Sequence, residues 1–135
     1  KIAYWDWGNE DAPPLVLVHG GRDHSRQWDK VARAFRDRFH VVAMDMRGHG
    51  DSDWAIGSQY GLPDMALDVV RMMETVGAPA TVICHSYGAQ ATTVASRDSR
   101  ARIAGSSAAP NRSSVISHAW RRGSRLRFRS ATTPL

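Results

Sequence analysis

The residues Cys84-His85-Ser86-Tyr87-Gly88 lie where an apolar run of the chain gives way to a helical pattern. Residues 80–84 predict a short strand that is buried on both faces. Residues 89–95 are mostly small and predict the start of a helix. A chain that passes directly from strand to helix turns sharply, and the turn pushes the Ser86 hydroxyl above the sheet edge. This is the setting that a nucleophilic serine requires.

Small residues on either side of Ser86 fit the same geometry. Gly88 lets the strand and the helix pack closely, and Cys84 is also small, although glycine is more usual at its position. The turn directs the backbone N–H of Tyr87 and the helix N-terminus towards one point, where they can stabilise an oxyanion. Taken alone, Ser86 would more simply be a turn or helix-capping serine. Whether Ser86 is a nucleophile or a capping residue therefore has to be decided from the other motifs of the chain.

The chain before this junction alternates between strand and helix patterns. Apolar or alternating runs predict strands over residues 2–7, 15–18 and 41–44. Apolar residues three or four apart predict helices over residues 28–38 and 63–76. This alternation, with continuous apolar strands, indicates an α/β protein whose mostly parallel sheet has helices on both faces.

Glycine-rich motifs directly follow the two apolar strands that precede residues 80–84. His19-Gly20-Gly21 follows the first, and Asp-Met-Arg-Gly-His-Gly-Asp-Ser, residues 45–52, follows the second. Together with residues 84–88, these motifs resemble the α/β-hydrolase fold family, in particular its serine esterase and lipase members. The resemblance extends from about residue 2 to residue 95. It predicts a partial α/β-hydrolase fold that lacks the C-terminal strands.

The resemblance implies a role for each motif. Ser86 would be the nucleophile, and the backbone N–H groups of Gly21 and Tyr87 would form the oxyanion hole. Four residues would shape the elbow and the neighbouring loop: His19, Gly20, Cys84 and Gly88. Such a site acts on a small-molecule carboxylic ester and needs no metal or organic cofactor. A serine nucleophile points away from the epoxide hydrolases and haloalkane dehalogenases of the family, which use a carboxylate.

The catalytic acid and base of such an enzyme are not recognisable. In the family they follow the serine in chain order, acid before histidine, after later strands. The 49 residues after Ser86 contain no such strand pattern, Asp98 comes too soon to be the acid, and His118 lies near the end. His85 should point away from the hydroxyl. Because an unactivated serine is a poor nucleophile, we expect little activity from this chain alone.

Other polar and aromatic residues have a structural interpretation. We expect both histidines of the strand-end motifs, His49 included, to be structural. Asp45 and Arg47 should stabilise their loop by charge and hydrogen bonding. Trp28 and Trp54 flank loops above the sheet edge, where they would either line an apolar substrate pocket or pack in the core.

The chain divides into two parts of opposite charge, which its overall charge of +5 conceals. Residues 1–95 hold 9 basic and 12 acidic residues, whereas residues 96–135 hold nine arginines, no lysine and one acid. The second part buries too little apolar surface to offset the entropy of ordering it. We therefore predict part of a hydrolase domain over residues 1–97 and a poorly ordered Arg/Ser-rich tail over residues 98–135.

The abrupt change in composition also favours a truncated or frameshifted copy of a longer hydrolase. If so, a shift of reading frame near codons 95–100 should restore a hydrolase-like continuation. The nucleotide sequence would test this expectation.

Composition argues against several other classes of protein. The single cysteine rules out an intrachain disulfide framework, and no apolar run approaches the ~20 residues that span a bilayer. No secretory signal opens the chain. We therefore expect a cytoplasmic protein with no membrane partner; the oligomeric state is not indicated.

Two alternatives to a serine hydrolase stay open. The same fold and pocket could serve a non-catalytic binding module. The basic tail could also attract anions or nucleic acid, but with few interleaved aromatic residues it would do so without specificity and in a salt-dependent way.

Overall fold

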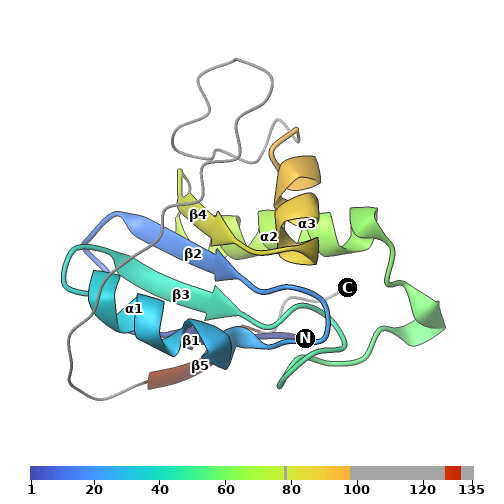
Figure 1. Ribbon diagram of the computed structural model, residues 1–135, viewed down its shortest axis with the longest axis horizontal. Helices are drawn as coiled ribbons and strands as arrows, with labels where there is room; N and C mark the ends of the chain where they lie inside the picture. The colour runs from blue at the N-terminus through green and yellow to red at the C-terminus, as the bar shows by residue number, and fades with distance from the viewer. Residues whose placement is uncertain (78, 98–126, 132–135) are drawn as a thin grey trace.

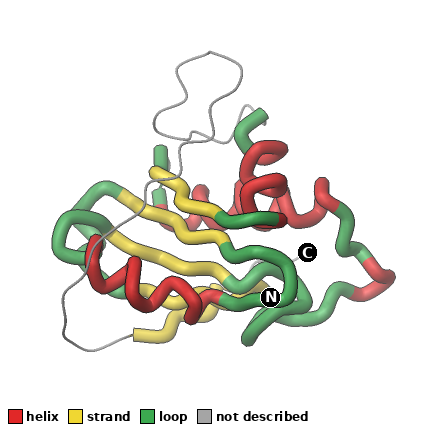
Figure 2. Tube along the Cα trace, in the orientation of Figure 1, coloured by secondary structure: helices red, strands yellow, loops and turns green. Residues whose placement is uncertain are grey.

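The computed structural model describes residues 1–77, 79–97 and 127–131 (Figure 1). Strands in this part of the chain are β1 (Ile2–Asp6), β2 (Pro14–Val18), β3 (His40–Met44), β4 (Thr81–Cys84) and β5 (Arg127–Ala131). Helices are α1 (Asp29–Phe35), α2 (Leu62–Val76) and α3 (Tyr87–Ala95), with short 3-10 turns η1 (Ser25–Trp28) and η2 (Ile56–Ser58). Figure 2 shows how the helices and loops surround the strands.

The strands form one sheet in the order β4-β2-β3-β1-β5. β2 pairs in parallel with both β3 and β4, so that Val16 lies opposite Val42 on one side and Val82 on the other. β1 runs antiparallel to β3, and β5 runs antiparallel to β1. Because β2, β3 and β4 are parallel, the loops that follow them meet at one edge of the sheet.

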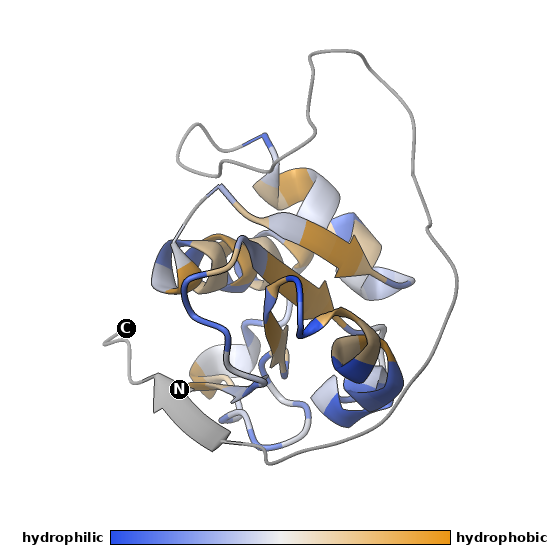
Figure 3. Ribbon diagram, turned by 90° about the vertical axis from the view of Figure 1, so that its left-hand side faces the viewer, coloured by the Kyte–Doolittle hydropathy of each residue, from blue (hydrophilic) through white to orange (hydrophobic). Residues whose placement is uncertain are grey.

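Helices cover both faces of the sheet, as the continuous apolar strands predicted. Alternate residues of β2 face opposite sides: Val16 packs with α2 and α3, whereas Leu17 packs with α1. The apolar residues of the strands lie between these helix layers (Figure 3). The layer beneath α2 and α3 contains all five methionines of the chain: Met44, Met46, Met65, Met72 and Met73.

Most predicted elements are present with small shifts at their ends. The helix expected over residues 28–38 is split into η1 and α1, and α2 begins at Leu62, one residue before Pro63. Gly77 caps the C-terminus of α2, and its φ of 87° is left-handed, a conformation that glycine adopts without steric cost.

β5 is an element that the sequence analysis did not predict. It lies within the stretch expected to be poorly ordered, and it pairs with β1 from Ile2↔Ala131 to Asp6↔Arg127. The predicted domain boundary at residue 97 and the order of the other tail residues lie outside the described part of the chain.

Candidate active site

Ser86 occupies the sharp turn that the sequence predicted between β4 and α3. Its φ of 50° and ψ of −119° place it in a region that residues with a side chain rarely adopt. The Ser86 carbonyl accepts a hydrogen bond from the Ala89 N–H at 3.0 Å, which begins the helix at once. The side chain of Ser86 is exposed. The turn therefore holds the hydroxyl out from the chain.

Gly88 permits the close approach of strand and helix on which this turn depends. It is buried, and a Cβ at this position would collide with the carbonyl oxygen of His19 and lie 2.9 Å from that of Val18. Cys84 lies opposite Val18 in the sheet. Burial raises the pKa of the Cys84 thiol, although a hydrogen bond with Thr92 opposes this shift. Cys84 is thus a small packing residue that stays protonated.

The loop after β2 lies directly beside the turn. A Cβ built on Gly20 would be 3.2 Å from Ser86 Cβ and 2.8 Å from His85 Nδ1. A Cβ built on Gly21 would be 3.9 Å from Tyr87 Cβ. The structure therefore brings together the glycine pair and the serine turn.

His19 joins the loops that follow β2 and β3. Its side chain is fully buried; Nε2 accepts a hydrogen bond from the Met46 N–H at 2.9 Å, and Nδ1 lies 2.7 Å from the Gly20 carbonyl. Because Nε2 accepts and the Gly20 carbonyl oxygen can only accept, the proton of the neutral ring lies on Nδ1, which donates to the Gly20 carbonyl. Burial lowers the pKa of His19 and keeps it neutral. These contacts make His19 a buried link between the two loops.

Asp45 anchors the loop after β3, as expected. Its carboxylate accepts the Ser25 N–H at 2.6 Å and the Asp51 N–H at 3.0 Å. It also fills the space beside Gly50, where a Cβ would overlap the carboxylate. Ser52 extends the anchor to β1, since its hydroxyl donates to the Asp45 carbonyl and accepts the Ala3 N–H.

Arg47 fixes the same loop to α2 through a buried ion pair. Its guanidinium donates to both carboxylate oxygens of Asp68, at 2.6 and 2.8 Å, and to the Gln59 carbonyl at 3.0 Å. The hydrogen bond to Asp68 is the largest cause of the raised pKa of Arg47. The sequence analysis did not single out Asp68. Its position within the apolar stripe of residues 65–73 was the one sequence signal of a buried acid that needs a basic partner.

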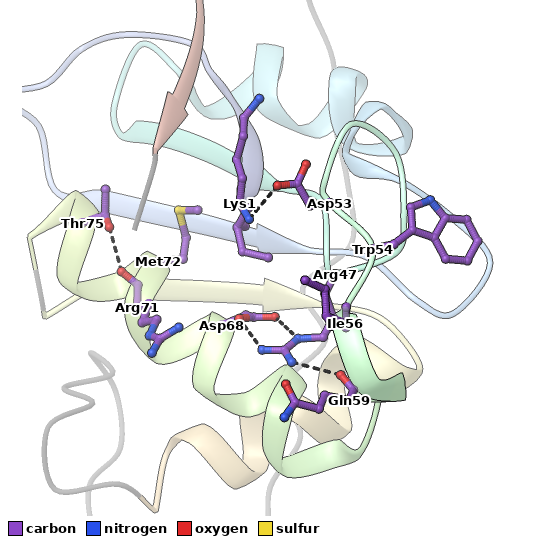
Figure 4. A pocket seen from close by; sticks show the side chains of 12 residues that line it. Lys1, Arg47, Asp53, Trp54, Ile56, Gln59, Asp68, Arg71, Met72 and Thr75 are labelled. Carbon is purple, nitrogen blue, oxygen red and sulfur yellow. Dashed lines mark hydrogen bonds and ion pairs between the residues drawn. The ribbon is translucent and has the colours of Figure 1, made fainter. Parts of the chain in front are cut away.

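A cavity of about 180 Å³ lies between the loop of residues 47–59 and α2 (Figure 4). Its walls include Arg47, Trp54, Ile56 and Met72, and no residue of the turn at Ser86 lines it. Trp54 is 81% exposed at its rim. Trp28, in contrast, is partly buried and packs against the core cluster that contains Ala32 of α1. Neither tryptophan therefore shares a described cavity with Ser86.

Within residues 1–77 and 79–97, no described hydrogen bond joins a base to the Ser86 hydroxyl. His85 is exposed, and none of the hydrogen bonds of the described histidines reaches the Ser86 hydroxyl. His118 and Asp98 lie outside the described residues. The same part of the chain contains no cluster of three or more side chains that could hold a metal ion.

The sequence model of the alpha/beta hydrolase family matches residues 15–135 of the chain. The chain belongs to the α/β-hydrolase family. The match continues beyond residue 95, where the resemblance carried by the motifs ends. The fold, with its parallel strands, flanking helices and serine turn, is therefore part of an α/β-hydrolase fold.

Relatives of this α/β-hydrolase family member include several kinds of enzyme. It is 37% identical over 89 residues to a bifunctional esterase/perhydrolase from Acinetobacter calcoaceticus, covering 64% of this chain and 32% of that protein. It is 30% identical over 90 residues to human epoxide hydrolase 4, covering 65% and 25%. Among solved structures, the thioesterase domain from the curacin biosynthetic pathway matches with a TM-score of 0.70 and 25% identity, covering 76% and 37%.

The α/β-hydrolase chain spans about a third of the length of the first curated relatives it matches. None of the described helices is long and apolar enough to cross a membrane.

Proposed function

We propose that this α/β-hydrolase acts on small-molecule carboxylic esters, with Ser86 as its nucleophile. The observation that carries the proposal is the exposed Ser86 at a strained turn, with Gly20 and Gly21 packed against it. A residue held in a rare backbone conformation is typical of a functional site. Buried neighbours such as Gly88 fix the turn and leave the hydroxyl accessible.

The proposed chemistry is acyl transfer in two steps. Ser86 Oγ forms a bond to the ester carbonyl carbon and loses its proton to a base, and the backbone N–H groups of Gly21 and Tyr87 stabilise the resulting oxyanion. The alcohol leaves with a proton as the carbonyl re-forms, and water then releases the acyl group from Ser86. The base has to come from outside the described residues.

The identity of residue 86 supports an ester rather than an epoxide as the substrate. One relative is an esterase/perhydrolase and another is an epoxide hydrolase. The resemblance implies a carboxylate nucleophile for epoxide opening, whereas this chain has a serine. The serine turn therefore favours the esterase branch.

A fluorophosphonate probe tests the proposal, because it reacts with activated serines. The proposal requires a base from outside the described residues, so it predicts labelling of the full chain at Ser86, located by mass spectrometry of the digested protein, and loss of labelling in Ser86→Ala. Ser96 is a matched control, since it is an exposed serine at the other end of the same helix. Ser96→Ala should label normally. Absence of labelling, or equal labelling of Ser86→Ala, would overturn the proposal.

A binding role is the second candidate, and the lack of a described base for Ser86 favours it. In that case Ser86 would remain unlabelled, and an ester would bind without being cleaved. Binding of a short-chain ester, measured by NMR shifts of Gly20 and Tyr87, would support this alternative only if no hydrolysis product accumulated.

A further inference from the structure

We propose that His49 is a positioning residue that holds the glycine loop beside Ser86 by accepting the backbone N–H of Arg22. The inference rests on the proposed function, in which Gly21 belongs to the oxyanion hole. His49 lies in the loop after β3, whereas Arg22 lies in the loop after β2. The contact therefore joins two loops that are far apart in sequence.

Hydrogen bonds at both ring nitrogens determine the tautomer of His49. Nδ1 lies 3.0 Å from the Arg47 carbonyl oxygen, which can only accept, so Nδ1 carries the proton. Nε2 of the neutral ring is then an acceptor, and the Arg22 N–H donates to it at 3.3 Å. A protonated His49 would have a donor at both nitrogens and would lose this bond.

Arg22 needs such a partner because its backbone is strained. Its φ is 61°, in the left-handed region that an arginine seldom occupies. A residue persists in this region only when surrounding contacts hold it there. Without the His49 contact, we expect Arg22 to sample other conformations.

The two peptide groups that flank Gly21 are each held by one histidine. His19 bonds the Gly20 carbonyl, which belongs to the same planar peptide group as the Gly21 N–H. His49 bonds the Arg22 N–H, which belongs to the next peptide group. Gly21 has no side chain to restrict it, so these two bonds set the direction of its N–H.

Several charged or titratable groups surround this contact. The loop after β2 contributes His19, Arg22 and Asp23, and the loop after β3 contributes Asp45 and Asp51. The rings of His19 and His49 lie 5.1 Å apart between centroids. Burial is the main cause of the lowered pKa of His19, and the charge of His49 adds to it. The contact between His49 and Arg22 thus lies beside the buried, neutral ring of His19.

The test compares two substitutions that differ in one hydrogen-bond acceptor. Asn at position 49 keeps a donor for the Arg47 carbonyl but is too short to reach Arg22, whereas Gln can place an oxygen near the position of Nε2. We expect His49→Asn to raise the amide exchange rate of Arg22 about fivefold to tenfold, the loss of one hydrogen bond. His49→Gln should restore most of the protection of the Arg22 amide. General damage to the loop would instead leave this amide unprotected in both variants.

Fluorophosphonate labelling of Ser86 provides the second measurement. Its rate should fall by a similar factor in His49→Asn and recover in His49→Gln.

The outcomes separate this inference from the proposed function. If Ser86 is never labelled, the proposed function fails, and Arg22 exchange still decides the role of His49. If Arg22 exchange is the same in the unsubstituted chain and in His49→Asn, the positioning role is wrong even where labelling occurs. If neither variant folds, the unsubstituted chain decides: an Arg22 amide that exchanges as fast as an unprotected amide overturns the positioning role.

Discussion

Ser86 is held in a backbone conformation that disfavours side chains, and its neighbours make this possible. Gly88 lies so close to the carbonyls of His19 and Val18 that no larger residue fits. Gly20, in the loop after β2, lies close to Ser86. A conformation of this kind typically destabilises the fold by about 1–3 kcal/mol. The backbone conformation of Ser86 therefore lowers the stability of the fold, and it leaves the Ser86 side chain exposed.

Replacement of Gly88 should damage the fold more than replacement of Gly21. In Gly88→Ala the new methyl group would overlap the His19 carbonyl oxygen, so we expect a loss of at least about 1–3 kcal/mol in unfolding free energy. In Gly21→Ala the methyl would make an ordinary contact at 3.9 Å from Tyr87 Cβ. Urea denaturation of the two variants measures the difference. Equal losses would show that close packing at Gly88 does not matter.

The loops after β2 and β3 are joined by buried polar groups, and His19 is the most enclosed of these. Its two hydrogen bonds hold only when the ring is neutral. Burial lowers its pKa below the ordinary value of 6.5. The unfolded chain therefore takes up this proton at a higher pH than the folded chain does.

This linkage predicts a pH dependence of stability. The contribution of His19 to the free energy of unfolding should be fully present above about pH 6.5. It should be lost as the pH falls towards the pKa of His19 in the folded chain, which is the lower of the two. Urea denaturation between about pH 5 and pH 8 measures the trend. His19→Gln cannot titrate, so its stability should depend less on pH over this range. An unchanged slope in that variant would contradict the assignment.

The ion pair between Arg47 and Asp68 fastens the loop after β3 to α2. Both side chains are almost fully buried, and removing one partner of a buried pair leaves an uncompensated charge. Asp68→Asn should therefore reduce the unfolding free energy by about 3–5 kcal/mol. Asp64 is the control, because it lies 3.7 Å from Arg47 and is partly exposed. Chemical denaturation should show a loss below about 1 kcal/mol for Asp64→Asn.

The comparison of sequence and structure shows which signals are local. β2, β3, β4 and the turn at Ser86 were predictable because apolar runs and small residues carry the information within a few positions. The partnership of Arg47 with Asp68 was not, because it joins distant residues and depends on how α2 docks. β5 was missed because its composition resembles that of the surrounding tail.

The sheet as a whole is enclosed unevenly. Within the described part of the chain, β4 pairs with β2 and has no strand on its other side. Its residues are only half-buried, whereas those of β3 are fully buried. An exposed, apolar edge strand offers unpaired backbone groups to another chain.

We therefore predict that the 135-residue chain associates through β4. A charge on an edge strand opposes such pairing, so Thr81→Lys should shift the chain towards monomer in sedimentation velocity at matched concentrations. Thr75→Lys adds the same charge on an exposed position of α2 and serves as the control. Equal effects of the two substitutions would point to net charge rather than to the edge.

The methionines beneath α2 and α3 have a consequence for the chemical lifetime of the molecule. All five lie in one core layer, and none is more than 3% exposed. Peroxide converts an accessible methionine to a polar sulfoxide, which an apolar core does not accommodate. The folded chain thus shields every thioether it has, and a single opening that admits the oxidant would prevent the core from closing again. Methionine sulfoxide would therefore accumulate in those chains that have opened at least once in the presence of the oxidant.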